Sequence, residues 1–250
     1  MEAQLPKVNC CICNYNKEDT VVDAVKSCLE QDYPNVSVVV CDDASTDNSV
    51  DLLVSEFKLK PWVKDKWPYT SQVFTSDTIK LEVLPERKGA AFARNRAIQQ
   101  EQAHIYAILD SDDLYLNQKV SKSVAVFLQN PVNIGLVYSD YSILNSSGDV
   151  DIHTNSFNRQ NLMNRCYINN GSLFTHLAYS KIGPYDEGLS TCEDYDFFLR
   201  LTEQFLAVHI PEPLLCVRQN GKNLSLTTPK FELEQNYNNT IIKLRKRLNI

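Results

Sequence analysis

Glycine is scarce in this 250-residue chain, which has 7 in all. None stands where a phosphate-binding loop would need it. The first apolar run, Val8 to Cys13, is followed by the polar break 14–19, which contains no glycine. Dinucleotide-dependent dehydrogenases place the pattern GxGxxG directly after a strand, and its absence excludes that class. Nucleotidyltransferases use a loop rich in glycine and lysine at the same point, so the break also counts against them.

The chain also lacks a long apolar segment and an excess of positive charge. No stretch approaches the roughly 20 apolar residues that span a bilayer. With 25 Lys and Arg against 31 Asp and Glu, the net charge of −6 argues against a nucleic-acid partner, because phosphate contacts need clustered cations. It does not argue against a nucleotide, whose diphosphate a metal ion can neutralise.

Two further features bear on location and metal binding. The eight cysteines are scattered and lack the paired spacing of a zinc site. No secretory signal is recognised, so free thiols and a cytoplasmic location are expected. The basic segment 241–248 could rest peripherally on the inner face of a membrane, although such a segment is more often a solvated helix.

Apolar runs alternate with helical patterns through the first half of the chain. This rhythm predicts an α/β fold with a mostly parallel central sheet flanked by helices. Segment 58–77 has no clear periodicity and is interpreted as an inserted loop or lid. The second half is less regular, with a strand near 134–144, a polar loop to about 170, and a helix from near 193. The predicted strands of the first half are Val8 to Cys13, Val36 to Cys41, Ile79 to Leu84 and Tyr106 to Leu109.

Polar and acidic residues stand where three of these strands end. They are Asn14-Tyr15, Asp42-Asp43 and the run from Asp110 to Asp113. Ligands bind beyond the carboxyl ends of parallel strands, so these residues are expected to meet in one site. Three neighbouring carboxylates repel one another and are tolerated mainly where a cation compensates them. An isolated acidic turn could also simply be solvated.

Four segments, read in order, resemble the family 2 glycosyltransferases. Val40 to Ser49 looks like that family's VVDDGSTDxS segment, and Lys88 to Ala97 resembles its GxxxARNxA helix. Asp110-Ser111-Asp112-Asp113 resembles its metal-binding DxD. Ile182 to Glu187, with Cys192 to Leu201, resembles its IGxFDE and EDxDxxLRL pair. The resemblance implies a Rossmann-like GT-A fold and an inverting transferase of the bacterial surface-polysaccharide type.

The same resemblance implies a division of the chain and its substrates. We expect one GT-A domain over 1–250, with a nucleotide-sugar-binding half at 1–115. An acceptor-binding half at 116–220 and a helical tail at 221–250 would follow. The expected donor is a nucleotide sugar, with a UDP-sugar favoured, and the expected acceptor is a glycan or a lipid-linked saccharide.

Roles for individual residues follow from the matched motifs. Asp194 is predicted to be the catalytic base that deprotonates the acceptor hydroxyl, with Glu193 orienting the acceptor. Asp112 and Asp113 are predicted to hold Mn²⁺ or Mg²⁺, which would stabilise the diphosphate leaving group. The predicted nucleotide-binding residues are Asn14, Tyr15, Asp43, Lys88, Arg94, Asp110 and Asp112.

Simpler interpretations of these residues stay open at this point. Tyr15 could be a turn aromatic, Arg94 could form a surface salt bridge, and the acids at 193–194 could favour a helix dipole. Two departures from the family pattern are visible. Asn220 stands where relatives carry a His of the metal site, and Ala44 replaces the usual glycine. A noncatalytic sugar-nucleotide-binding or scaffold domain is the main alternative function.

Overall fold

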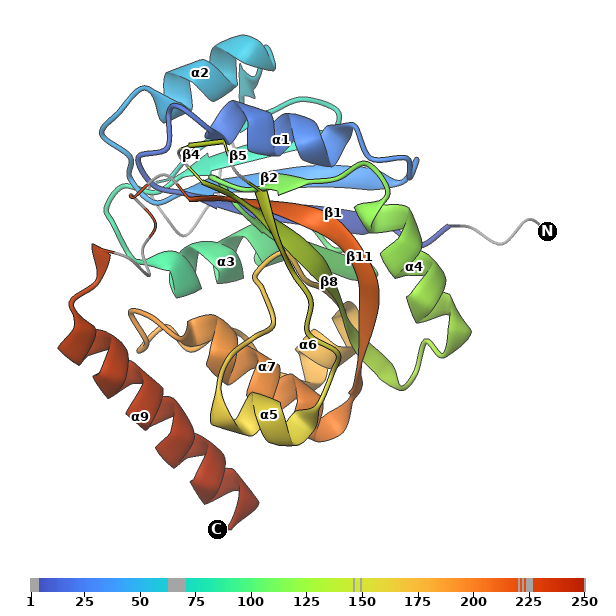
Figure 1. Cartoon of the computed structure of the whole chain (residues 1–250). Coiled ribbons are helices and arrows are strands. Elements are labelled where there is room, and N and C mark those ends of the chain that lie inside the picture. Colours follow the sequence, from blue (N-terminus) through green and yellow to red (C-terminus); the bar gives the residue numbers. More distant parts are fainter. Residues whose placement is uncertain are drawn as a thin grey trace.

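The computed structural model describes residues 5–62, 71–145, 147–148, 150–219, 221, 223 and 227–249. Figure 1 shows a twisted central sheet with helices on both faces. The strands are β1 Val8–Asn14, β2 Val36–Asp42, β3 Lys60–Pro61, β4 Gln72–Thr75, β5 Ile79–Val83, β6 Ile105–Asp110, β7 Leu114–Tyr115, β8 Ile134–Asn145, β9 Val150–His153, β10 Leu173–Thr175 and β11 Leu206–Gln219. The helices are α1 Val21–Leu29, α2 Ser49–Glu56, α3 Ala90–Gln99, α4 Lys119–Gln129, α5 Arg159–Asn164, α6 His176–Ile182, α7 Glu193–Gln204 and α9 Lys230–Leu248.

The sheet joins the two halves of the chain. Its strand order is β3-β4-β5-β2-β1-β6-β10-β8-β11-β7, with β9 paired to β8. The four strands β5, β2, β1 and β6 are parallel, as are β8 and β11. Strand β10 lies between these two groups and is antiparallel to both β6 and β8. The prediction of an α/β fold with a mostly parallel centre is confirmed.

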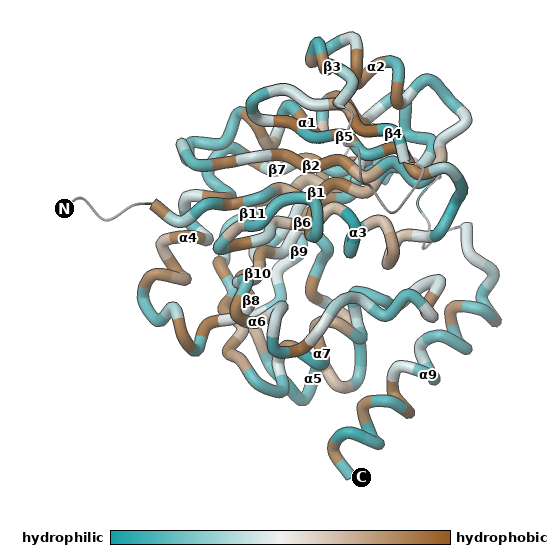
Figure 2. Tube along the Cα trace, turned by 180° about the vertical axis from the view of Figure 1, so that it is seen from behind, coloured by the Kyte–Doolittle hydropathy of each residue, from teal (hydrophilic) through white to brown (hydrophobic). Residues whose placement is uncertain are grey.

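Successive side chains of the central strands point to opposite faces of the sheet, so the core has two layers. Val8, Cys10 and Ile12 of β1 face one layer, where helices α1, α2 and α4 pack. Cys11 faces the other, which is covered by α3, α5, α6, α7 and α9. A buried strand with both faces covered needs apolar residues at every position, which explains the continuous apolar runs. Figure 2 shows these hydrophobic stretches along β1 and β2.

Two parts of the fold differ from the sequence prediction. Segment 58–77 is not wholly a loop, because β3 and β4 lie within it and β4 pairs antiparallel with β5 at the edge of the sheet. Residues 63–70 of that segment, with the expected lid, lie outside the described residues. The loop expected up to about 170 contains β9 and α5. Short elements such as these give too few periodic positions to be recognised in a sequence.

The last helix, α9, lies against α7. The rings of Tyr237 in α9 and Tyr195 in α7 stack with centroids 5.7 Å apart, and Leu244 of α9 is buried in the core. Lys243 forms an ion pair with Asp186. The basic residues predicted as a solvated or membrane-facing tail are therefore partly used inside the fold. In the part of the chain that the structure describes, no helix combines the length and apolar character needed to cross a membrane.

Candidate active site

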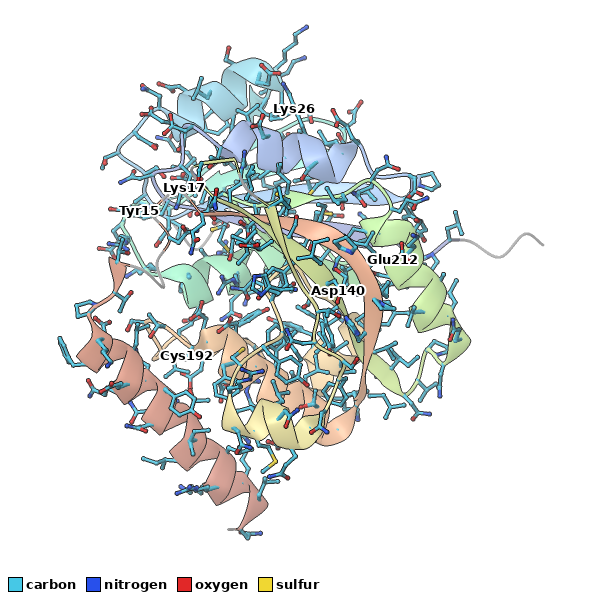
Figure 3. The ribbon with its side chains drawn as sticks, in the orientation of Figure 1. Tyr15, Lys17, Lys26, Asp140, Cys192 and Glu212 are labelled. Atoms are coloured by element: carbon cyan, nitrogen blue, oxygen red, sulfur yellow. The ribbon has the colours of Figure 1, made fainter. Side chains whose placement is uncertain are left out.

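The carboxyl ends of β1, β2 and β6 meet at one edge of the sheet, as the sequence predicts. Asn14 is in register with Asp42, and Cys13 with Asp110. The start of α7 faces the same region from the other half of the chain. Figure 3 shows Tyr15 and Lys17 at this edge, with Cys192 at the start of α7 below them.

Asn14 is used to build the site rather than to line its surface. Its side chain is 1% exposed, and its Nδ2 donates to Asp42 Oδ2 at 2.7 Å and to Ser45 Oγ at 3.2 Å. Asp42 in turn accepts from the backbone N–H and the hydroxyl of Ser45. These bonds fix the turn after β2, in which Ala44 has φ of 59°. Ala44 thus holds a left-handed conformation that glycine adopts without strain, so the replacement of the family glycine has a backbone cost.

Asp43 joins the turn after β2 to the loop before α3. Its two carboxylate oxygens accept from the backbone N–H of Lys88 at 2.6 Å and of Gly89 at 2.8 Å. Gly89 has φ of 95°, which brings both N–H groups toward one carboxylate. Burial raises the pKa of Asp43, although these two hydrogen bonds oppose the rise. The Lys88 side chain pairs with Glu86, while the guanidinium of Arg87 lies over the Tyr15 ring, 4.1 Å from its centroid.

The acidic run after β6 is surrounded by cationic and amide groups. Lys17 Nζ lies 2.6 Å from Asp112 Oδ2. Asp113 accepts a hydrogen bond from the backbone N–H of Arg218 at 3.1 Å, and Arg218 Nε donates to the Asp112 carbonyl at 2.6 Å. Burial, together with the charges of Asp110 and Asp112, raises the pKa of Asp113 well above its ordinary value. A raised pKa favours the protonated, neutral form of Asp113, which reduces the repulsion within the run.

Arg94 connects the acidic run to the start of α7. Its Nη2 lies 2.8 Å from Asp110 Oδ1, and its Nη1 pairs with Glu193. The side chains of Arg94 and Glu193 are 4% and 6% exposed, so their pair is buried and is not a surface salt bridge, while Asp110 is 31% exposed. Removing one member of a buried pair typically costs about 3–5 kcal/mol. Arg94 was predicted to meet a phosphate or a base, whereas its guanidinium contacts two carboxylates here.

Glu193 and Asp194 form the first turn of α7. The preceding residue, Cys192, has φ of 63°, and this sharp entry places both acids at the helix start. Asp194 is half-buried and accepts from the backbone N–H of Tyr195 at 2.7 Å. Burial and the neighbouring charge of Glu193 raise the pKa of Asp194 to about 7. A carboxylate with such a pKa can accept a proton near neutral pH.

Helix α9 holds the loop that leads into these acids. Asn236 is buried, and its Nδ2 donates to Ser190 Oγ and Thr191 Oγ1, both at 2.9 Å. Ser190 Oγ donates to Glu232 at 2.6 Å. Sequence reasoning missed Asn236, as it missed Asn95, whose amide exchanges hydrogen bonds with the backbone of Tyr185. Neither contact leaves a local signal, because the partners are far apart in the chain.

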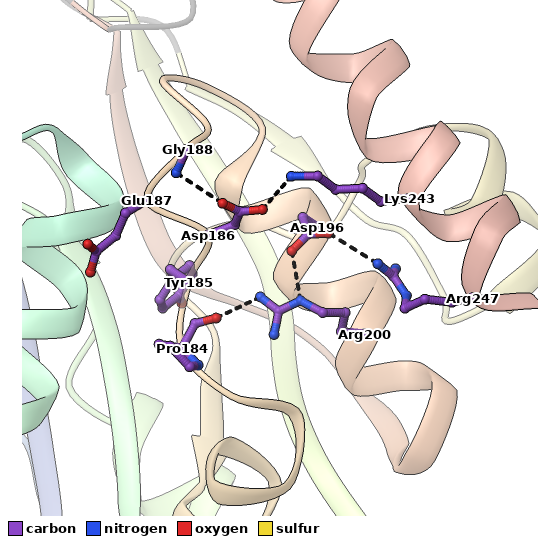
Figure 4. Close-up of a pocket in the computed structure, with 9 residues that line it drawn as sticks. All are labelled: Pro184, Tyr185, Asp186, Glu187, Gly188, Asp196, Arg200, Lys243 and Arg247. Carbon is purple, nitrogen blue, oxygen red and sulfur yellow. Dashed lines mark hydrogen bonds and ion pairs between the residues drawn. The ribbon is translucent and has the colours of Figure 1, made fainter.

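Two open cavities border the loop 184–191. One, of about 510 Å³, lies between Lys88 and the start of α3 on one side and residues 187–191, which lead into α7, on the other. The second, of about 560 Å³, lies on the far side of the loop and is shown in Figure 4. There Arg200 pairs with Asp196 at 2.7 Å, and Arg247 lies 3.5 Å from the same carboxyl group. These charges are already paired with one another. The side chains around the second cavity therefore hold α7 against α9.

The described residues contain no group of three His, Cys, Asp or Glu side chains placed to hold a metal ion together. A divalent cation bound by one or two carboxylates and by substrate phosphates needs no such group. Asp112 fits that requirement, since it already attracts the ammonium of Lys17. Asn220, which stands where relatives carry a His of the metal site, lies outside the described residues.

Solved structures of GT-A glycosyltransferases share this fold. TarS 1–349 from S. aureus in complex with UDP has a TM-score of 0.69 at 15% identity, covering 95% of this chain and 65% of that one. The mannosyltransferase PcManGT from Pyrobaculum calidifontis, in complex with GDP-Man and Mn²⁺, has a TM-score of 0.68 at 17% identity, covering 98% and 65%. At these identities the likeness establishes the fold alone.

The family follows from the sequence comparison. The sequence model of glycosyl transferase family 2 matches residues 10–183, so the chain belongs to that family. The UDP-Glc:alpha-D-GlcNAc-diphosphoundecaprenol beta-1,3-glucosyltransferase WfgD of Escherichia coli is 28% identical over 88% of this chain and 79% of its own length. Chondroitin synthase of Escherichia coli is 24% identical over 94% of this chain. The chain spans 32% of that synthase.

Proposed function

We propose that this family 2 glycosyltransferase moves a sugar from a nucleotide donor, with a UDP-sugar favoured, to a hydroxyl group of a glycan or lipid-linked saccharide, with inversion at C1. The name of WfgD, which gives a UDP-glucose donor and a diphosphoundecaprenol-linked acceptor, supports both substrate classes. PcManGT with GDP-Man makes a GDP-sugar the main competing donor. The observation that carries the proposal is the half-buried Asp194, with a pKa raised to about 7, next to the Glu193 that Arg94 links to Asp110 of the acidic run.

In this proposal the base accepts the proton of the acceptor hydroxyl. Asp194 takes the proton as the hydroxyl oxygen forms a bond to C1 of the donor sugar. The bond from C1 to the diphosphate oxygen breaks on the opposite face, and its electron pair leaves with the diphosphate. General-base assistance of this kind contributes about 10²–10⁴-fold in rate. Glu193 orients the acceptor while it also pairs with Arg94.

The donor would lie along the strand ends. Tyr15 and Asp43 are proposed to contact the base, and Asp110 the ribose, with Asn14 holding the turn beneath them. Lys88 and Arg94 complete the proposed set, Arg94 acting through Asp110 and Glu193. Asp112, with Asp113 beside it, would hold Mn²⁺ or Mg²⁺, which supplies positive charge to the departing diphosphate when bound.

The whole chain would then work as one domain. Residues 1–115 would bind the donor and 116–220 the acceptor, because Arg94 and Asp110 belong to the first part and Glu193 to the second. In the tail at 221–250, Arg245 and Lys246 are exposed, while Lys243 and Arg247 pair with acids of the fold. Arg245 and Lys246 are therefore the cations of α9 that would meet an anionic membrane surface.

Calorimetric titration of UDP, with and without Mn²⁺, tests the donor site. Wild type should bind UDP more tightly with Mn²⁺, and Asp112→Asn should lose that gain. Transfer from candidate UDP-sugars then tests the chemistry: Asp194→Asn should lose transfer and keep UDP affinity. If UDP and GDP both fail to bind, the donor site is wrong. If nucleotide binds and transfer survives in Asp194→Asn, the base assignment is wrong.

A further inference from the structure

One oxygen of the acidic run attracts two donors. Asp112 Oδ2 lies 2.6 Å from Lys17 Nζ and 3.4 Å from the amide nitrogen of Asn223. The same Nδ2 donates to the Arg218 carbonyl at 3.1 Å. The other end of the amide, Asn223 Oδ1, is buried and accepts no hydrogen bond from the described residues. A buried amide oxygen without a partner is costly, and such groups in a folded protein call for a physical reason.

The orientation of this amide suits a carboxylate that has no metal ion beside it. An N–H group relieves the negative charge of Asp112, whereas a carbonyl oxygen facing it would be repelled. With a divalent cation on Asp112 the preference reverses, because hard cations bind amide oxygens and an amide NH₂ cannot ligate them. A half-turn of the amide exchanges its two ends and would present Oδ1 to the cation. The same half-turn would give the orphaned oxygen a partner, in exchange for the hydrogen bond from Nδ2 to the Arg218 carbonyl.

We infer that Asn223 supplies an amide oxygen ligand to the divalent cation held by Asp112. This inference rests on the proposed function, since it assumes a cation at the donor diphosphate. The ammonium of Lys17 supplies a positive charge beside Asp112, as the cation would. It is carried on a flexible side chain and can move away when a cation binds. One carboxylate, one neutral oxygen and phosphate oxygens make an ordinary ligand set for Mn²⁺ or Mg²⁺.

A second asparagine at the acidic run provides a matched comparison. Asn170 Nδ2 donates to Asp110 Oδ2 at 3.3 Å, and its Oδ1 is likewise buried without a partner among the described residues. Asp110, however, is already held by the guanidinium of Arg94 at 2.8 Å. That cation is buried and fixed by two carboxylates, so it leaves less need for a metal ion at Asp110. The two asparagines therefore make the same kind of contact, but Asn170 contacts Asp110 and Asn223 contacts Asp112.

The test titrates MnCl₂ into the protein saturated with UDP and measures Mn²⁺ affinity by calorimetry. We expect Asn223→Ala to weaken Mn²⁺ binding at least tenfold, while Asn170→Ala and Asn220→Ala stay within threefold of wild type. UDP affinity without metal should be unchanged in Asn223→Ala. Asn223→Asp restores an oxygen ligand and should recover Mn²⁺ binding, and Asn170→Asp controls for the added negative charge.

Each outcome separates this inference from the proposed function. If Asp112→Asn loses Mn²⁺ and Asn223→Ala keeps it, the cation site stands and the Asn223 ligand is refuted. If Asn220→Ala is the variant that loses Mn²⁺, the ligand is the neighbouring asparagine. If wild type with UDP binds no Mn²⁺, the metal part of the proposed function fails and this inference fails with it. Thermal unfolding of the metal-free variants identifies any that are merely misfolded.

Discussion

The acid limb of the pH–rate profile gives the sharpest test of the base. Asp194 accepts a proton only when ionised, so turnover should rise as the pH passes through about 7. Part of that high pKa comes from the neighbouring charge of Glu193, after the larger effect of burial. Glu193→Gln removes this charge and keeps the shape. The ionised form of Asp194 is then less opposed, and the limb should move to lower pH.

The size of the shift follows from Coulomb's law. Two carboxylates on adjacent residues, ~7 Å apart, repel by about 2 kcal/mol at an effective dielectric constant of 20. That energy corresponds to between one and two pKa units. Because Asp194 is partly exposed, solvent screening reduces the expected shift to about one unit. Arg94, freed from Glu193, would act on Asp194 in the same direction.

The assay is kcat measured between pH 5 and 9 at saturating donor and acceptor. Glu203→Gln is the matched control, since Glu203 lies at the other end of α7 and pairs with Arg247. It should leave the limb in place. If the acid limb of Glu193→Gln stays at the same pH or moves to higher pH, the electrostatic argument is refuted. Asp194→Asn should lower kcat by about 10²–10⁴-fold across the whole range.

Three further predictions concern stability. Asn236→Ala removes both hydrogen bonds to the loop before the base and should cost about 1–3 kcal/mol in urea unfolding. The exposed Asn239→Ala should cost almost nothing. Ala44→Gly relieves a backbone φ of 59° and should stabilise the fold by up to about 1 kcal/mol, after the entropic cost of glycine; a destabilised variant would contradict this. Burial lowers the pKa of Lys119 to about 7, so the folded chain binds fewer protons than the unfolded chain above that pH. Stability should therefore rise by about 2 kcal/mol between pH 7 and 9, and Lys119→Met should abolish the rise.

The first half of the chain was predictable from sequence because its signals are local. Buried strands require apolar residues on both faces, and parallel strands bring their carboxyl ends together whatever the loops contain. These two rules alone place Asn14, Asp43 and Asp110 at one edge, as observed. The short strands β3, β4 and β9 escaped prediction because two to four residues cannot display a period.

The links between the two halves could not be predicted from sequence. Arg94 stands in a helix with no acidic residue within six positions of it, and nothing local shows that Glu193, far along the chain, is its partner. Asn223 reads as one more polar residue of a loop, and its position beside Asp112 depends on the path of the chain after β11. Side-chain partners separated by many residues are set by packing, which a single sequence does not display.

The short strand β10 gives the fold a kinetic property. Leu173 pairs with Ala107 of β6 and with Val137 of β8, both much earlier in the chain. Such distant pairings must first overcome the entropy of closing long loops, which makes them late events in folding. A chain that has formed its parallel strands but not this bridge would hold the acidic run without the proposed base, Asp194, in place. Refolding should therefore restore nucleotide affinity before it restores turnover.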